Sequence, residues 1–241
     1  MLRGNGELRI MKMPMKLFRA AITLLVGLAV TVFALQGTAR AQAGKDSKFM
    51  GFKVEGKRIV LLFDLSKSVV TKAQASGMPL QKIMEQTDAM INSLPPESQF
   101  GLIQFVRNYK PFTEDLVPAT KENRELAKAW MEVEWNETGM MPRNGKGVIA
   151  PDPNGFPAVL RAAYALKPDL IFVISDGSFE RGAGGKNEEV PEEEFEALFK
   201  ELAPEGTKIP LNFVGFQMNK DDKSFWSRMT RRLGGELKEL D

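Results

Sequence analysis

The chain has 241 residues, and its 33 lysines and arginines nearly balance its 31 aspartates and glutamates, for a formal net charge of +2. It contains neither cysteine nor histidine, which excludes zinc bound by these residues, a cysteine nucleophile and a histidine general base. Without disulfides, an exported chain must depend on its hydrophobic core for stability.

The N-terminal 43 residues have the pattern of a secretory signal peptide. Lys12, Lys16 and Arg19 form the positively charged region before the apolar run. An uncharged, mostly apolar run of 16 residues follows at positions 20–35. Positions 41–43 then read Ala-Gln-Ala, a small-x-small cleavage signal, so we expect cleavage after Ala43.

Two alternatives concern this leader. Met11, Met13 or Met15 as the true start would give a more ordinary signal length. The competing interpretation is an uncleaved membrane anchor, but the apolar run is short for a bilayer span of about 20 residues. We favour cleavage, which predicts an exported protein, periplasmic or secreted, with no membrane segment in its mature form.

Removal of residues 1–43 changes the charge balance, because six basic residues and one acid lie there. The remaining 198 residues carry 27 basic and 30 acidic side chains, a formal net charge of −3. The lysines are dispersed among acids, so we expect no nucleic-acid partner. This length suits one α/β domain with a full core, placed at residues 58–241 after a lead-in at 44–57.

An apolar segment at residues 59–63 ends on Asp64, and Ser66 and Ser68 follow at alternate positions. An apolar run bounded in this way predicts a buried parallel strand. Its last residues would lie at the carboxyl edge of an open α/β sheet, where such folds bind ligands. One carboxylate and two hydroxyls offer hard oxygen atoms, which suit Mg²⁺, Mn²⁺ or Ca²⁺. Taken alone, the pattern also fits a strand-end turn with hydroxyl caps.

Apolar strands alternate with amphipathic helices along the chain. Strands are predicted at residues 59–64, 99–105, 170–175, 211–216 and 236–240, with a short antiparallel edge strand at 109–112. Helices are predicted at residues 79–94, 121–133, 157–166, 191–202 and 223–233, and loops at 136–155 and 178–187. The alternation predicts a Rossmann-like, doubly wound α/β fold, with helices on both faces of a mostly parallel sheet.

The apolar stripes of these helices indicate ordinary core packing rather than a cofactor site. Leu126, Trp130 and Val133 share one face of the helix at 121–133, so this face is expected to pack inward. Trp226 is expected in the core for the same reason.

A second strand-end acid supports the site. Asp176 directly follows the predicted strand at 170–175, and Gly177 permits the sharp turn after it. If the two strands are neighbours, Asp64 and Asp176 converge, and a cation or water must separate carboxylates that would otherwise repel each other. The sequence therefore predicts a shared site, although Asp-Gly alone is also an ordinary turn.

These motifs resemble the von Willebrand factor type A domains, in which Asp-x-Ser-x-Ser belongs to a metal-ion-dependent adhesion site. The similar segments are residues 56–64, 97–105, 166–177 and 209–216, followed by a helix and Gly234-Gly235. They occur in the family's order and cover roughly residues 50–241. The resemblance implies the fold predicted above.

The resemblance also implies a protein-binding module and no enzymatic activity. A bound Mg²⁺, or else Mn²⁺ or Ca²⁺, would be completed by an aspartate or glutamate of the partner protein. Asp64 and Asp176 would hold the cation directly or through water, and Ser66 and Ser68 would supply hydroxyl oxygens.

The chain departs from the family pattern in two places. Lys67 and Val69 replace the usual glycine and methionine of the first motif, so the Lys67 ammonium is expected to compete with the metal. The family threonine is missing from the loop before the third helix. By spacing, Asn154 falls nearest to its position, with Asp152 close by, and either side chain would offer an oxygen ligand.

Two other classes of protein remain as alternatives. One is a degenerate type A scaffold that binds partners without metal. The other is a phosphatase similar to the haloacid dehalogenases, in which a strand-end aspartate attacks phosphate. That chemistry needs a second acid two residues on, where this chain has Ser66, so we expect no catalysis.

Overall fold

The computed structural model describes residues 47–141, 145–150, 154–183, 186–204 and 207–240. The chain divides into two units, Met1–Ala43 and Gly44–Asp241, and every described residue belongs to the second. The predicted signal peptide lies outside the described residues. Within the described ranges, no helix is long and apolar enough to cross a membrane.

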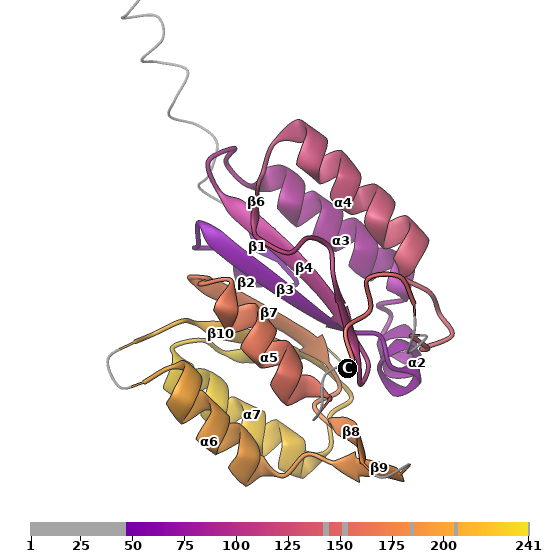
Figure 1. The fold of residues 1–241 in the computed structure, drawn as a ribbon, viewed down its shortest axis with the longest axis vertical. Coiled ribbons are helices and arrows are strands. Elements are labelled where there is room, and N and C mark those ends of the chain that lie inside the picture. Colours follow the sequence, from indigo (N-terminus) through magenta and orange to yellow (C-terminus); the bar gives the residue numbers. More distant parts are fainter. Residues whose placement is uncertain (1–46, 142–144, 151–153, 184–185, 205–206, 241) are drawn as a thin grey trace, which may run out of the picture. The chain divides into compact units, whose positions relative to one another are not determined.

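A mostly parallel sheet forms the centre of the fold (Figure 1). Its parallel strands are β3 (Arg58–Asp64), β4 (Gln99–Phe105), β7 (Leu170–Ser175), β10 (Leu211–Phe216) and β11 (Leu237–Leu240). The strand order is β11-β10-β7-β3-β4-β5; β5 (Tyr109–Pro111) and β6 (Val117–Pro118) both pair antiparallel with β4. The predicted strands, including the antiparallel edge strand, are confirmed.

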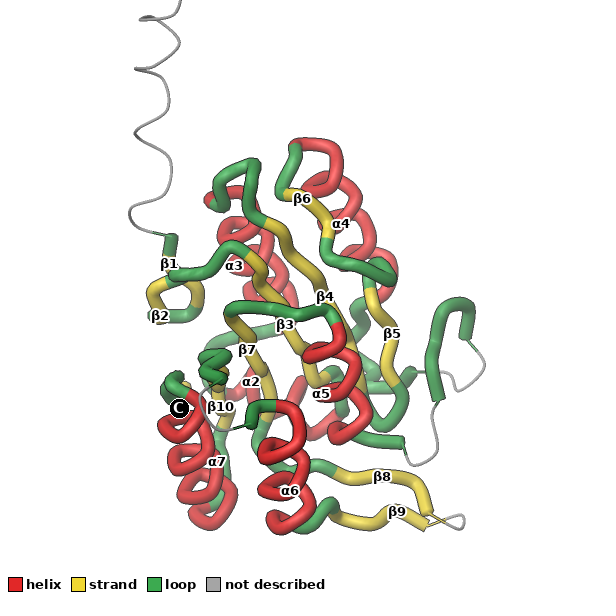
Figure 2. Tube along the Cα trace, turned by 60° about the vertical axis from the view of Figure 1, so that its left-hand side comes forward, coloured by secondary structure: helices red, strands yellow, loops and turns green. Residues whose placement is uncertain are grey.

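Helices cover both faces of the sheet, as predicted for a doubly wound fold (Figure 2). One face carries α2 (Lys67–Ala75), α3 (Leu80–Ser93) and α4 (Lys121–Glu134), and the other α5 (Phe156–Ala165), α6 (Glu192–Leu202) and α7 (Lys220–Leu233). Side chains alternate along β3, so Ile59, Leu61 and Phe63 pack under the first set of helices and Val60 and Leu62 under the second.

Some short elements were not predicted from the sequence. Strands β1 (Lys48–Phe49) and β2 (Phe52–Lys53) form a hairpin in the lead-in, and both of their phenylalanines pack edge-on against Phe172. Helix α2 follows β3 almost directly. The lead-in therefore contributes to the core of the domain.

Two sequence predictions are wrong. The segment 178–187, predicted as a loop, contains β8 (Glu180–Ala183), which pairs antiparallel with β9 (Lys186–Glu189). In α4, Leu126 and Val133 are 53% and 80% exposed, and the helix buries Ala127 and Met131 instead. The inward face of α4 was predicted from its larger apolar residues. A small residue such as alanine contributes little to a hydrophobic pattern, so the burial of Ala127 was not foreseen.

The strand order creates a topological switch point between β3 and β7. From β3 the chain continues to β4 on one side, and it returns to β7 on the other side of β3. The connecting helices α2 and α3 lie on one face of the sheet, whereas α5, which leads into β7, lies on the other. The connections therefore diverge at the carboxyl ends of β3 and β7, which is where open α/β sheets bind ligands.

Candidate functional site

Asp64 is the last residue of β3 and is 5% exposed. Its Oδ2 accepts a hydrogen bond of 2.7 Å from the Ser175 hydroxyl, at the end of neighbouring β7. Its Oδ1 accepts one of 2.9 Å from the backbone N–H of Ser66. Donors from two chain segments thus orient the carboxylate at the switch point.

The two motif hydroxyls lie beside each other at the start of α2. Ser66 is the N-cap residue of this helix, but its side chain makes no capping hydrogen bond. Its Oγ instead lies 3.2 Å from the Oγ of Ser68. The alternative of a strand end with hydroxyl caps therefore does not describe Ser66, and the two oxygens are paired next to Asp64.

Asp176 follows β7 and is 2% exposed. Gly177 after it has a φ of +88°, which only glycine adopts without strain, so the predicted sharp turn is present. The carbonyl of Gly177 accepts a 3.0 Å hydrogen bond from the indole N–H of Trp226 in α7. This bond holds the turn that positions Asp176.

The charge of Asp176 contributes to the pKa of Asp64. The pKa of Asp64 is raised to about 7, mainly by burial and also by the charge of Asp176, against the opposing effect of the hydrogen bonds from Ser175 and Ser66. A carboxylate buried beside another carboxylate is stabilised by a cation between them. Sequence reasoning thus correctly brought Asp64 and Asp176 together with Ser66 and Ser68 at one edge of the sheet.

The oxygens of this site fit a hard divalent cation by their chemistry, since two carboxylates and two hydroxyls suit Mg²⁺, Mn²⁺ or Ca²⁺. Within the part of the chain that the structure describes, no group of three or more acidic side chains is arranged to hold a metal. A cation at this edge would therefore rely on the serine hydroxyls and on water as well as on Asp64 and Asp176.

The side chains of Asn154 and Lys67 do not have the roles that the sequence suggested for them. The Oδ1 of Asn154 accepts a 2.8 Å hydrogen bond from the backbone N–H of Gly182 in β8, so its amide oxygen holds the hairpin rather than the four site residues. Asp152 lies outside the described residues. Lys67 is exposed at the start of α2, and the ammonium that reaches the site comes from Lys72, whose Nζ lies 2.9 Å from Asp176 Oδ2.

Sequence reasoning missed three side chains of this edge. Ser175, Lys72 and Asp222 carry no motif of their own. Asp222 lies in the first turn of α7, and its pKa is raised to about 6, mainly by burial and also by the charges of Glu189 and Asp176. The register of β3 against β7 would have indicated Ser175, because the residue opposite Asp64 is the one after Ile174.

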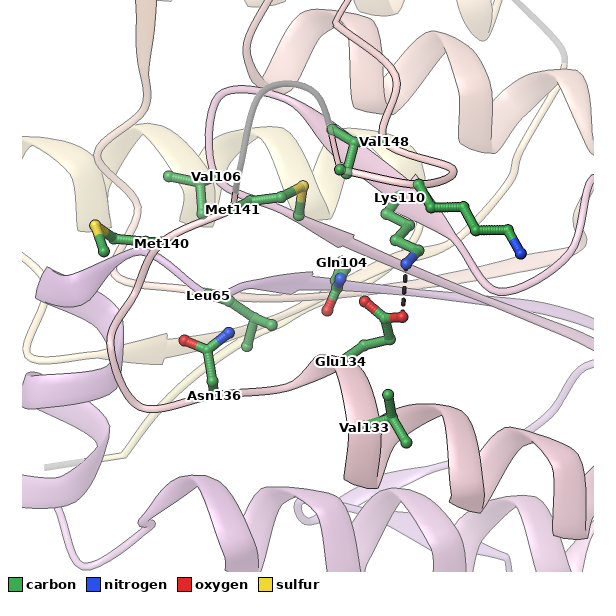
Figure 3. A pocket seen from close by; sticks show the side chains of 12 residues that line it. Leu65, Gln104, Val106, Lys110, Val133, Glu134, Asn136, Met140, Met141 and Val148 are labelled. Atoms are coloured by element: carbon green, nitrogen blue, oxygen red, sulfur yellow. Dashed lines mark ion pairs between the residues drawn. The ribbon is translucent and has the colours of Figure 1, made fainter.

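A loop and a small pocket lie beside the site. Gly139 has a φ of +65°, and a Cβ on it would lie 2.3 Å from the backbone nitrogen of Lys67, so the loop packs directly on the start of α2. The pocket has a volume of about 310 Å³ and is bordered by Leu65, which follows Asp64. Figure 3 shows Gln104 within it and the ion pair of Lys110 with Glu134 on its wall, 2.6 Å between Nζ and Oε1.

The raised pKa of Asp64 predicts a pH dependence of stability in the presence of a chelator. Between pH 3.8 and about 7, folded Asp64 holds a proton that the unfolded chain has lost. The free energy of unfolding should therefore fall as pH rises through this window, by at most about 1.4 kcal/mol per pH unit from this group. Urea unfolding of wild type and Asp64→Asn at several pH values isolates the effect, because asparagine does not titrate. Parallel pH profiles for the two proteins would contradict it.

Comparison with known proteins supports the fold. No family model matches the chain, and no curated protein matches it. Among solved structures, it is similar to a von Willebrand factor type A protein from Catenulispora acidiphila, with a TM-score of 0.52 and 12% identity over 78% of this chain and 40% of that one. The chain thus spans less than half the length of that protein.

Two further solved structures are similar at lower scores. An aerotolerance-related membrane protein from Bacteroides fragilis has a TM-score of 0.44 and 16% identity over 76% of this chain and 90% of that one. The PilB minor pilin from Streptococcus sanguinis has a TM-score of 0.46 and 13% identity over 79% and 58%. The fold assignment rests on the first comparison: the chain has the von Willebrand factor type A fold, as its motifs predicted.

Proposed function

We propose that this protein is a protein-binding module whose contact surface is the carboxyl edge of the sheet, and that a divalent cation takes part in the contact. Asp64 and Asp176 would hold the cation, directly or through water, and Ser66 and Ser68 would supply hydroxyl oxygens. The cation would supply an open coordination position for an aspartate or glutamate of the partner. The observation that carries this proposal is the convergence of two buried carboxylates and two paired hydroxyls on the switch point.

We propose a binding role rather than catalysis for reasons of chemistry. Asp64 is held by Ser175 and Ser66, and the position two residues on, where a phosphatase of the haloacid dehalogenase type needs an acid, is a serine. We further propose that residues 1–43 direct export and are removed after Ala43, which would place the module in a periplasm or outside the cell.

A second candidate function is a type A scaffold that binds its partner without metal. Two contacts favour it. Lys72 already supplies a positive charge to Asp176, and the amide oxygen of Asn154, at the position where the family has a metal ligand, is bonded to Gly182.

A pull-down from extracts of the native host separates the two candidates. With wild-type protein as bait, we expect a partner that is retained in Mg²⁺ and released by a chelator. An Asp64→Ala bait should not retain it, whereas an Arg161→Ala bait, changed at an exposed ion pair with Glu201, should. A partner that stays bound in chelator and also binds the Asp64→Ala bait would favour the metal-free scaffold.

A further inference from the structure

Helix α2 brings one lysine into the candidate cation site. The Nζ of Lys72 lies 2.9 Å from Oδ2 of Asp176, and the two side chains are 33% and 3% exposed. The charge of the lysine also partly opposes the rise that burial causes in the pKa of Asp222 in α7, so it acts on more than one acid of this edge. The ammonium therefore lies where a cation bound to Asp176 would have its charge.

Lys72 and a divalent cation compete for the same oxygen. Metal ions of this class bind carboxylate oxygens at about 2.0–2.6 Å, and a cation that close to Asp176 Oδ2 would repel an ammonium hydrogen bonded to it. The lysine has a flexible four-carbon stem and is one-third exposed. It can therefore move into solvent without opening the core, whereas Asp176 has to remain where the turn holds it.

The exchange would keep Asp176 paired in both states. A buried carboxylate without a partner is costly, and Asp176 is almost fully buried. Lys72 supplies the positive partner when no metal is bound, and the metal supplies it otherwise.

We propose that Lys72 is an internal cation that occupies the site in the metal-free protein and must leave Asp176 before a divalent cation binds, so that it sets the metal affinity of the site. This inference rests on the proposed cation site and names the residue that tunes it. It assigns to Lys72 the role that the sequence pattern suggested for Lys67.

The test is calorimetric titration of Mn²⁺ into the purified wild-type protein, Lys72→Met, Lys72→Arg and Lys67→Met at pH 8. We expect Lys72→Met to bind Mn²⁺ roughly tenfold or more tightly than wild type, because the cation no longer has to displace an ammonium that is hydrogen bonded to Asp176. Lys72→Arg, which keeps the charge, should stay close to wild type. Lys67→Met removes an exposed charge from the same helix and should change the affinity far less.

Three results would overturn the inference. Equal affinities of wild type and Lys72→Met would leave the cation site in place and remove the role of Lys72. An equal gain in Lys67→Met would assign the effect to the net charge of the helix. Failure of both wild type and Lys72→Met to bind Mn²⁺ would contradict the proposed cation site itself. If Lys72→Met folds poorly because Asp176 loses its partner, Lys72→Gln, which keeps a hydrogen-bond donor, provides the same comparison.

Discussion

Replacement of Trp226 by alanine is expected to lower the free energy of unfolding by about 3–5 kcal/mol, the range for a large aromatic residue removed from a core. Trp226 is 1% exposed. Its ring contacts six phenylalanine rings, those of Phe156, Phe179, Phe195, Phe199, Phe213 and Phe225. These rings come from the sheet, from α5, α6 and α7, and from the segment after β7. Loss of the indole ring therefore removes packing contacts between the sheet and all three helices on this face.

Trp226→Phe separates packing from the hydrogen bond to Gly177, and Val133→Ala serves as a surface control. Trp226→Phe keeps an aromatic ring but leaves the buried Gly177 carbonyl without its 3.0 Å donor, which should cost about 1–3 kcal/mol. Val133→Ala shortens an apolar side chain that is 80% exposed and should stay within about 0.5 kcal/mol of wild type. Urea unfolding measures all three. A loss below about 1 kcal/mol in Trp226→Ala would contradict the packing described for this face.

A divalent cation is expected to stabilise the wild-type protein and to leave Asp64→Ala unchanged. A ligand that binds only the folded state at 100 times its dissociation constant adds about 2.7 kcal/mol. Asp64 is the carboxylate that β3 places at the switch point, and its alanine variant removes both oxygens that Ser175 and Ser66 orient. Thermal unfolding with Mg²⁺ or with chelator measures the difference.

A matched control for this prediction lies at the opposite edge of the sheet. Asp169 precedes β7 and accepts hydrogen bonds from the backbone N–H groups of Lys57 and Arg58. Asp169→Asn changes an exposed acid at the amino end of β7, and we expect it to keep the full response to Mg²⁺ whatever its basal stability. An Asp64→Ala protein that responds as strongly as wild type would place the cation elsewhere.

The sheet was predictable because its strands carry strong local signals. Residues 99–105, 170–175 and 211–216 are short apolar runs bounded by turns, and the observed strands have these same limits. The site residues were predictable for a related reason: Asp64 and Asp176 each end such a strand, and parallel strands bring their carboxyl ends to one edge.

The features that could not be predicted are side-chain contacts between segments far apart in the sequence. Lys72 is one of many lysines in the sequence, and only the position of α2 beside the end of β7 pairs it with Asp176. Asn154 was placed by counting residues back along the chain, but its side chain is used by the β8–β9 hairpin, whose polar strands carry no hydrophobic alternation. Sequence spacing alone does not contain either pairing.

A crystal structure of the protein grown with Mn²⁺, with anomalous differences recorded for the manganese, tests whether the carboxyl edge of the sheet holds a divalent cation. We expect an anomalous peak bounded by Asp64, Asp176 and the hydroxyls of Ser66 and Ser68, with the Lys72 side chain turned away from Asp176. A structure at saturating Mn²⁺ with no peak at this edge and Lys72 still paired with Asp176 would contradict this expectation.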